Sequence, residues 1–387
     1  MSAAYDTIDH KILLQKLEHY GIRGSPLKLI ESYLKDRKQF VEIEIFRSQI
    51  LESLECSVIQ GSKLSGLFYT IYTNEIPLLY KLLHNDWYQK LTGAVSQKFK
   101  FIYHLTVNFV DDSTSIVTFS ETNLIRKYLE NYYNLLQNYY NINKLKINPD
   151  KTLLLIINKP KHDPPLKNFF FMAESYKIEP KRCIQILGSY IENNLKLNTE
   201  IGKLTSILHH RLNELNKIKK YTNFETRLQF VNSHIIGTIN YMLPIYMHAS
   251  AHLKDKLHKV LMKAARYSIG NYCFKKSTYY ILNKCKLTTI NNMISISAIK
   301  LIHKTLHNES PEVILEYYKL NKRKSADIFY NYVPKSANMN KYFVYQGVKL
   351  FNSIPVKIKD LPPIKFNNQI KRYITDPASV VHVRAIN

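Results

Sequence analysis

The most constraining feature of this sequence is a pair of adjacent acidic residues between two apolar runs. Asp111 and Asp112 follow the run 105–110 and precede the run 116–119. This pattern predicts two strands joined by a tight turn, with both carboxylates at its tip. Because Asp adopts turn geometry at low cost, the pair by itself could serve only to form the turn. Two carboxylates held together at a sheet edge also form a site for hard divalent cations, Mg²⁺ above all. Such a metal site is typical of enzymes that transfer phosphoryl groups.

The charge of the chain indicates a partner. The sequence has 55 Lys and Arg against 30 Asp and Glu, a net charge of +25, and 29 Tyr and 17 Phe are interleaved with them. Distributed cations and aromatic rings suit a phosphate backbone with stackable bases. Net charge alone is equally compatible with a basic protein that binds no nucleic acid, because it governs association rather than fold.

Membrane and cysteine patterns narrow the cellular setting. No uncharged apolar run approaches the roughly 20 residues of a membrane helix, so no membrane partner is expected. The four cysteines form no C-x-x-C pair and are widely separated: Cys56, Cys183, Cys273 and Cys285. This spacing argues against a zinc site and a disulfide framework, and it favours a reducing, intracellular compartment without distinguishing nucleus from cytoplasm.

The first two hundred residues mix helical and strand patterns. Apolar residues at helical spacing predict four helices, the third interrupted at Pro77, over 10–19, 25–34, 64–83 and 122–142. Alternating residues predict a hairpin of strands 40–45 and 54–59, and further strands at 151–157, 169–172 and 184–191. We therefore expect an α+β fold for this part of the chain.

Beyond Thr199 the sequence becomes basic and mostly helical. Periodic stretches predict helices over 200–220, 224–239 and 252–269. Residues 320–342 are polar and weakly periodic, which indicates a flexible connection, and apolar residues return at 343–358. We predict three parts, which are an α+β part, a basic helical domain, and a C-terminal segment with a flexible start, over 1–195, 196–318 and 319–387.

Several short motifs occur in one order along the chain. They are AAYDTIDH at 3–10, QGSKL at 60–64, FVDD at 109–112, LKINPDKT at 145–152, ILG at 186–188 and LFNSIP at 350–355. This ordered set resembles the reverse transcriptase of non-LTR, LINE-type retrotransposons over most of the chain. The resemblance implies an RNA-directed DNA polymerase with a right-hand architecture, in which a palm of partial antiparallel sheet and helices precedes a helical thumb. The implied partners are an RNA template, a DNA primer and deoxynucleoside triphosphates.

The resemblance also implies the catalytic residues. Asp111 and Asp112 would be catalytic and would bind two Mg²⁺ ions, with the primer 3′ oxygen and the incoming triphosphate held in line. Tyr5 would lie under the sugar of the incoming nucleotide, where its ring can exclude a 2′-hydroxyl. The alternative interpretation is that Tyr5 is an ordinary core residue.

Other matching positions would bind substrate. Gln60 and Gly61 would belong to the turn and helix that carry the nucleotide and template, and Lys151 would assist pyrophosphate departure. Leu187 and Gly188 would grip the primer end. The alternatives are a solvated cation for Lys151 and plain strand packing for the Leu187 and Gly188 pair.

The first motif is incomplete relative to the family. The family places its metal-binding aspartate six positions before Asp6, which falls upstream of Met1. We therefore expect the 387-residue chain to be an inactive fragment without the third metal carboxylate, the fingers or the endonuclease. Asp6 follows the aromatic position and Asp9 is expected to cap the next helix, so neither is a good substitute. The alternative function is a non-catalytic nucleic-acid-binding or scaffolding protein derived from a retrotransposon.

Overall fold

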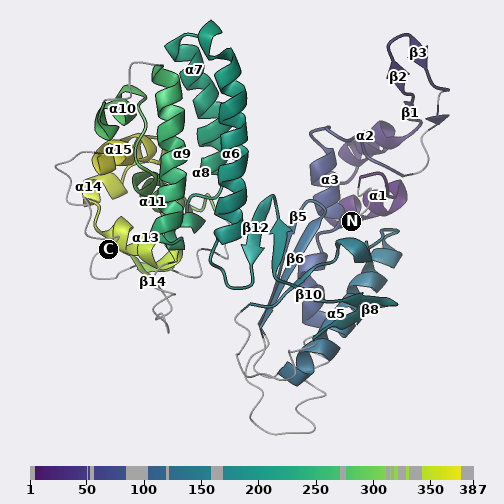
Figure 1. Ribbon diagram of the computed structural model, residues 1–387. Coiled ribbons are helices and arrows are strands. Elements are labelled where there is room, and N and C mark those ends of the chain that lie inside the picture. The colour runs from purple at the N-terminus through teal and green to yellow at the C-terminus, as the bar shows by residue number, and fades with distance from the viewer. Residues whose placement is uncertain are drawn as a thin grey trace. The chain divides into compact units, whose positions relative to one another are not determined.

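The computed structural model mixes helices with small sheets, which confirms the α+β class (Figure 1). The residues that it describes are 5–49, 51–52, 56–83, 103–118, 122–157, 169–270, 276–310, 314, 318–320, 328–330 and 342–375. The chain divides into two compact units, Met1–Leu187 and Gly188–Asn387.

The first helices of the N-terminal unit follow the predicted boundaries. Helices α1 (His10–His19) and α2 (Ser25–Leu34) have the predicted ends. Asp9 caps α1, as predicted, because its Oδ1 accepts a hydrogen bond from the N–H of Ile12 at 3.0 Å. The predicted interruption near Pro77 is also present, since α3 (Ser65–Tyr72) ends before the 3-10 turn η1 (Ile76–Leu78).

The hairpin predicted from 40–45 and 54–59 is wrong. Strand β2 (Glu42–Ile43) pairs with β3 (Phe46–Arg47), and β1 (Lys38–Gln39) pairs with β4 (Leu51–Glu52). The chain reverses at Glu44, whose φ is +55°, so the turn lies inside the run that was predicted as one strand. An alternating pattern does not reveal such a turn, because residues on both sides of it keep the same period.

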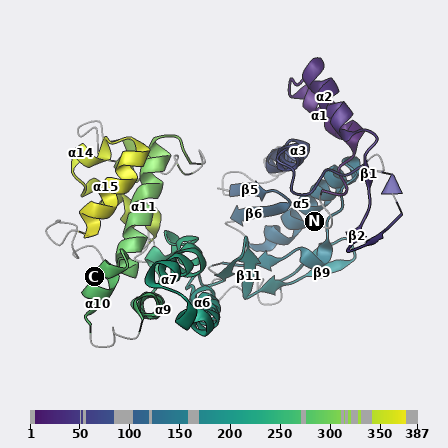
Figure 2. The same ribbon diagram turned by 90° about the horizontal axis from the view of Figure 1, so that it is seen from above.

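A long hairpin and a long helix form the middle of this unit. Strands β5 (Tyr103–Phe109) and β6 (Asp112–Thr118) pair antiparallel along their whole length. They lie beside α5 (Thr122–Ile142), whose boundaries match the prediction (Figure 2). On α5, the Tyr133 ring lies 6.4 Å from the Phe171 ring of β8 (Phe171–Ala173), which pairs with β9 (Tyr176–Ile178).

Two further strand predictions need correction. Within 151–157 only β7 (Leu154–Leu155) is a strand, and it pairs parallel with β10 (Pro180–Lys181). Lys151 belongs to the 3-10 turn η2 (Pro149–Lys151), because the Asn148 side chain accepts hydrogen bonds from the N–H groups of residues 150 and 151.

The strand predicted over 184–191 is two strands. Strand β11 (Cys183–Ile186) and strand β12 (Ser189–Glu192) are separated by a turn at Leu187 and Gly188. The φ values of these two residues are +47° and +82°, which no continuous strand allows.

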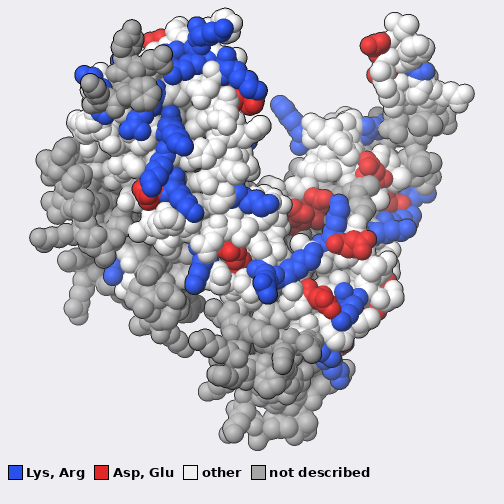
Figure 3. Space-filling model, viewed as in Figure 1, with Lys and Arg blue, Asp and Glu red and all other residues white. Residues whose placement is uncertain are grey.

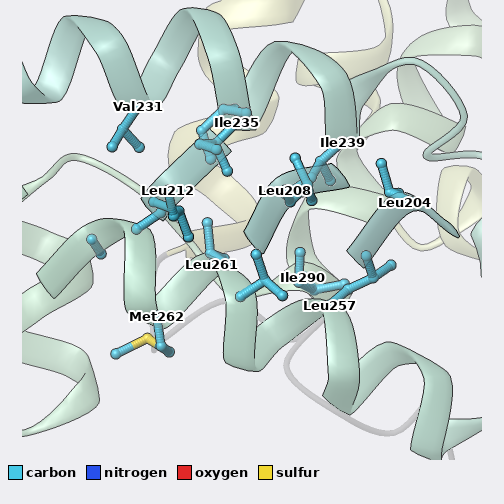
Figure 4. Packing of buried hydrophobic residues seen from close by; sticks show 14 of the residues in the cluster. Leu204, Leu208, Leu212, Val231, Ile235, Ile239, Leu257, Leu261, Met262 and Ile290 are labelled. Carbon is cyan, nitrogen blue, oxygen red and sulfur yellow. The ribbon is translucent and has the colours of Figure 1, made fainter. Parts of the chain in front are cut away.

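In the C-terminal unit, β12 is followed by a helical bundle, as predicted from the periodic stretches. Its helices are α6 (Asn198–Ile218), α7 (Phe224–Phe230), the π-helical turn η5 (Val231–Ile236), α8 (Gly237–Asn240), α9 (Ala251–Ile269), α10 (Thr278–Lys284) and α11 (Ile290–Leu306). Leu208 of α6, Ile235 of η5 and Leu261 of α9 meet in one apolar core (Figure 4). Burial of this core is the main stabilising contribution to the bundle.

A second core lies at the C-terminal end. Helices α13 (Phe343–Asn352), α14 (Val356–Lys359) and α15 (Pro363–Thr375) share it with α11. Strand β13 (Tyr318–Leu320) pairs with β14 (Ile328–Tyr330), and the buried side chains of Tyr318 and Ile328 belong to the same core. The flexible connection predicted over 320–342 is therefore wrong at its strand residues, and 321–327 and 331–341 lie outside the described residues. Among the described helices, none combines the length and the apolar character needed to cross a membrane.

Candidate functional site

The acidic pair lies at the tip of the β5–β6 hairpin. Phe109 pairs with Asp112, which leaves Val110 and Asp111 as the turn. Val110 has a φ of +53°, a strained conformation for a β-branched residue that costs on the order of 1–3 kcal/mol. Asp111 is half-buried and Asp112 is exposed. The turn thus holds one carboxylate against the protein and presents the next to solvent.

Buried tyrosines lie close to Asp111. Burial raises the pKa of the Tyr69 hydroxyl, and the charges of Asp111 and the neighbouring tyrosines raise it further. Burial also raises the pKa of Tyr140 to about 12, despite a hydrogen bond with Ser113, and Asp111 again contributes. Tyr69 comes from α3 and Tyr140 from α5, so the tip of the hairpin lies near both helices.

Tyr5 belongs to the same neighbourhood. Its ring centroid lies 5.5 Å from that of Tyr69, and its hydroxyl lies 4.0 Å from where a Cβ on Gly66 would stand. The structure therefore places Tyr5 and Asp111 around one buried ring. Ala3 and Ala4, which precede Tyr5 in the motif, lie outside the described residues.

The Gln60 turn is connected to the Tyr5 segment. The Val58 N–H donates to the Tyr5 carbonyl at 2.9 Å, and Gln60 Nε2 donates to Asp6 Oδ1 at 3.4 Å. Gly61 follows with a φ of +85°, a conformation that favours glycine. Hydrogen bonds thus connect the Tyr5 segment to the turn that contains Gln60 and Gly61.

Asp9 has a structural role. Its side chain is buried, with Oδ1 bonded to the start of α1 and Oδ2 paired with Lys144 Nζ at 2.6 Å. Burial alone would raise the pKa of this carboxyl, but the Lys144 ammonium and the Ile12 N–H together hold the pKa below its usual value. Both oxygens of this carboxylate are therefore committed to contacts within the protein.

The remaining predicted site residues lie elsewhere. Lys151 is exposed in η2, where its backbone N–H is bonded to Asn148. Leu187 ends the first unit and Gly188 begins the second.

A hydrogen-bond network under the hairpin was not predicted from the sequence. His104 Nδ1 lies 2.8 Å from the Tyr128 hydroxyl, and its Nε2 lies 3.0 Å from Thr106 Oγ1. Thr106 Oγ1 also lies 2.9 Å from the Tyr132 hydroxyl and 2.8 Å from Ser115 Oγ. This network fixes the hairpin on α5 through polar contacts. The sequence does contain a signal for this network. Polar side chains occupy alternate positions of 104–108, and two tyrosines one helical turn apart, Tyr128 and Tyr132, follow in the next helix.

The same register explains an exposed apolar face. Side chains alternate along a strand, so the inward position of His104 and Thr106 turns Val107 and Phe109 outward. Val107 is 49% exposed and Phe109 is 61% exposed. The apolar run before the acidic pair therefore faces away from α5 rather than into it.

Within the described ranges, no three His, Cys, Asp or Glu side chains are grouped closely enough to hold a metal ion. Asp111 and Asp112 nevertheless supply the anionic oxygen donors that hard divalent cations prefer.

Comparison with known families supplies an independent finding. Residues 1–191 match the family model of the reverse transcriptases (RNA-dependent DNA polymerases), so this part of the chain is a reverse transcriptase domain. Polymerases of this family act on nucleic-acid templates and primers with nucleotide substrates, and they generally use divalent metal ions. No curated protein matches the chain.

Proposed function

We propose that this chain is the RNA-directed DNA polymerase of a non-LTR, LINE-type retrotransposon, with Asp111 and Asp112 as its catalytic carboxylates. The observation that carries the proposal is the hairpin tip, where Asp111, directly followed by Asp112, lies near Tyr69, the ring against which Tyr5 packs. In a polymerase, one bound nucleotide would place its triphosphate near the metal-binding carboxylates and its sugar against an aromatic ring. An acidic tip close to an aromatic ring therefore suits a nucleotide site.

The two carboxylates suit Mg²⁺ because their oxygens are hard, anionic donors. Bound divalent metal would supply charge neutralisation at the transferring phosphate and activation of the primer 3′-hydroxyl. Asp111 and Asp112 would hold that metal, and the strained turn at Val110 keeps both carboxylates at the tip. The Tyr5 ring, fixed against Tyr69, would exclude a ribose 2′-hydroxyl.

The other expected roles and boundaries follow from the resemblance and stay proposals. Gln60 and Gly61 would contact the nucleotide and template, Lys151 would assist pyrophosphate departure, and Leu187 with Gly188 would grip the primer. The palm would cover 1–195, the thumb 196–318 and a C-terminal segment 319–387. We propose an intracellular location on the cysteine spacing alone.

Nucleotide binding tests the proposed site directly. We expect a fluorescent deoxynucleoside triphosphate to bind in the presence of Mg²⁺, and Asp111→Asn to weaken that binding about tenfold or more, because the substitution removes an anionic metal ligand. Asp150→Asn is the matched control, since Asp150 is an exposed aspartate in η2. Equal affinities for the two variants would refute the assignment of Asp111.

The same assay tests Tyr5. Tyr5→Ala should narrow the preference for deoxyribonucleotides over ribonucleotides, since the ring that would exclude the 2′-hydroxyl is gone. An unchanged preference would remove Tyr5 from the nucleotide site.

Primer extension separates the polymerase from the alternative. Mg²⁺-dependent extension of a DNA primer on an RNA template, abolished by Asp111→Asn, would establish the polymerase. Nucleic-acid binding without nucleotide binding would favour the non-catalytic alternative.

A further inference from the structure

A groove lies between α6 and α9 in the helical unit, outside the segment that matches the polymerase family. Its volume is about 580 Å³. Thr205 and His209 line it from α6, and Thr278, the first residue of α10, lines it as well. The opposite wall is one face of α9.

The α9 wall is a stripe of cations. Lys256, Lys259, Lys263 and Arg266 line the groove and recur every three or four residues, so they share one face of the helix. Ten residues of α-helix rise about 15 Å, which is the length of the stripe. Figure 3 shows basic side chains following α9 along the face of this unit. Asp255 offsets part of this charge through an ion pair with Lys259 at 2.7 Å.

Like charges in the groove repel one another. His209 is half-buried, and both burial and the charge of Lys263 lower its pKa. The positive charge of Lys263 thus acts on the opposite wall of the groove, and an anion bound there would offset it. The elongated stripe favours a linear polyanion over a single compact anion. A nucleic-acid strand carries one phosphate per roughly 3.4 Å of helix axis, so the stripe would face about four phosphates.

Exposed tyrosines continue from the end of the groove at Thr278. Tyr279 is 71% exposed and Tyr280 is 43% exposed. Lys276 Nζ lies 5.4 Å from the centre of the Tyr280 ring. Exposed rings beside cations are the usual platform for base stacking, and only unpaired bases offer a free face to them.

We propose that this groove binds the backbone of a single-stranded nucleic acid, whose bases stack on Tyr279 and Tyr280. The groove lies in the C-terminal unit, whereas Asp111 and Asp112 belong to the N-terminal unit, and binding in the groove requires no metal ion. It would hold a strand on the helical unit whether or not the reverse transcriptase domain is turning over.

Binding of labelled oligonucleotides to the full chain in EDTA tests the proposal. We expect a 20-nucleotide single strand to bind more tightly than a duplex of the same length. The double variant Lys256→Glu with Lys263→Glu should weaken single-strand binding about tenfold or more. The magnitude of the slope of log affinity against log salt should also fall by roughly 1.4, because each lost phosphate contact on a single strand contributes about 0.7. Lys357→Glu with Lys365→Glu is the matched control, because both lysines are exposed on α14 and α15 and the net charge changes equally.

Stacking is tested separately at Tyr279. Tyr279→Ala should weaken single-strand binding several-fold, and Tyr279→Phe should restore it, because the ring and not the hydroxyl stacks. Circular dichroism should show the same helical content in all variants, since every changed residue is exposed.

Three results would overturn the inference. One is equal weakening by the groove and control double variants, which would indicate a general charge effect. Another is tighter binding of the duplex, and the third is equally tight, groove-dependent binding of polyaspartate, which would indicate an acidic peptide. This assay uses neither Mg²⁺ nor a nucleoside triphosphate, so failure of the polymerase proposal and failure of this one are distinguishable.

Discussion

Thr106→Val is the sharpest test of the network that holds the acidic hairpin on α5. Thr106 is 4% exposed, and its Oγ1 lies within 3.0 Å of His104 Nε2, Ser115 Oγ and the Tyr132 hydroxyl. Valine has nearly the same shape, so the substitution removes the oxygen without opening a cavity. The cost is then the loss of buried hydrogen-bond partners, about 2 kcal/mol for groups of this kind.

The effect should appear as local opening of the hairpin. A loss of about 2 kcal/mol corresponds to about a thirtyfold increase in the opening equilibrium. Amide hydrogen exchange of peptides from residues 103–118, followed by mass spectrometry, measures that increase directly. Thr114→Val is the matched control, because Thr114 pairs with Val107 on the outward face of the same hairpin. Its exchange should change less than that of Thr106→Val, since Thr114 lies on the face of the hairpin opposite the network around Thr106.

The comparison of the two variants decides the argument. If Thr106→Val exchanges no faster than Thr114→Val, then the hydroxyl of Thr106 does not hold the hairpin. Water or a shifted tyrosine would then satisfy the same groups at no cost in free energy.

Two predictions concern the helical unit. Gly347→Ala should destabilise it by about 1–3 kcal/mol in urea unfolding, although alanine is the better helix former, because the new Cβ would stand 2.8 Å from Ile302 Cδ1; an unchanged midpoint would show that this core can relax. Burial and the nearby His307 lower the pKa of His303, so the folded state binds a proton at this imidazole less readily than the unfolded state does. The free energy of unfolding should therefore be at its full value above about pH 6.5 and should fall as the pH drops below about 6.5. Thermal unfolding between pH 5 and 8 measures this fall, and His303→Phe should make it shallower, whereas a curve as steep as that of the unchanged chain would refute the assignment.

Local periodicity determined most of the helices. Helices α1, α2, α5 and α9 agree with the predicted ranges to within a residue, because caps and apolar spacing are local properties. Strand pairing was harder to predict. The turn at Glu44 and the turn at Leu187 both fall inside stretches that alternate like single strands. Left-handed backbone at ordinary residues leaves no mark in an alternating pattern.

The candidate site shows the same division. The order of the motifs identified Asp111, Tyr5 and Gln60 as site residues. It did not show that Tyr69 lies between Tyr5 and Asp111, since that neighbourhood joins segments more than 35 residues apart in the chain. The basic stripe of α9 is visible in the sequence as spacing, but its pairing with His209 across a groove depends on how α6 and α9 pack.

The sequence by itself determined the α+β class, the main helices and the acidic tip of the hairpin, because these depend on spacing and on the chemistry of neighbouring residues. Only the tertiary structure decided which face of that hairpin is buried. An apolar run would be expected to turn inward, yet His104 and Thr106 face α5 and Val107 and Phe109 face outward. The tyrosine hydroxyls of α5 offer partners to a polar strand face, and those partners come from a helix whose position no local pattern specifies.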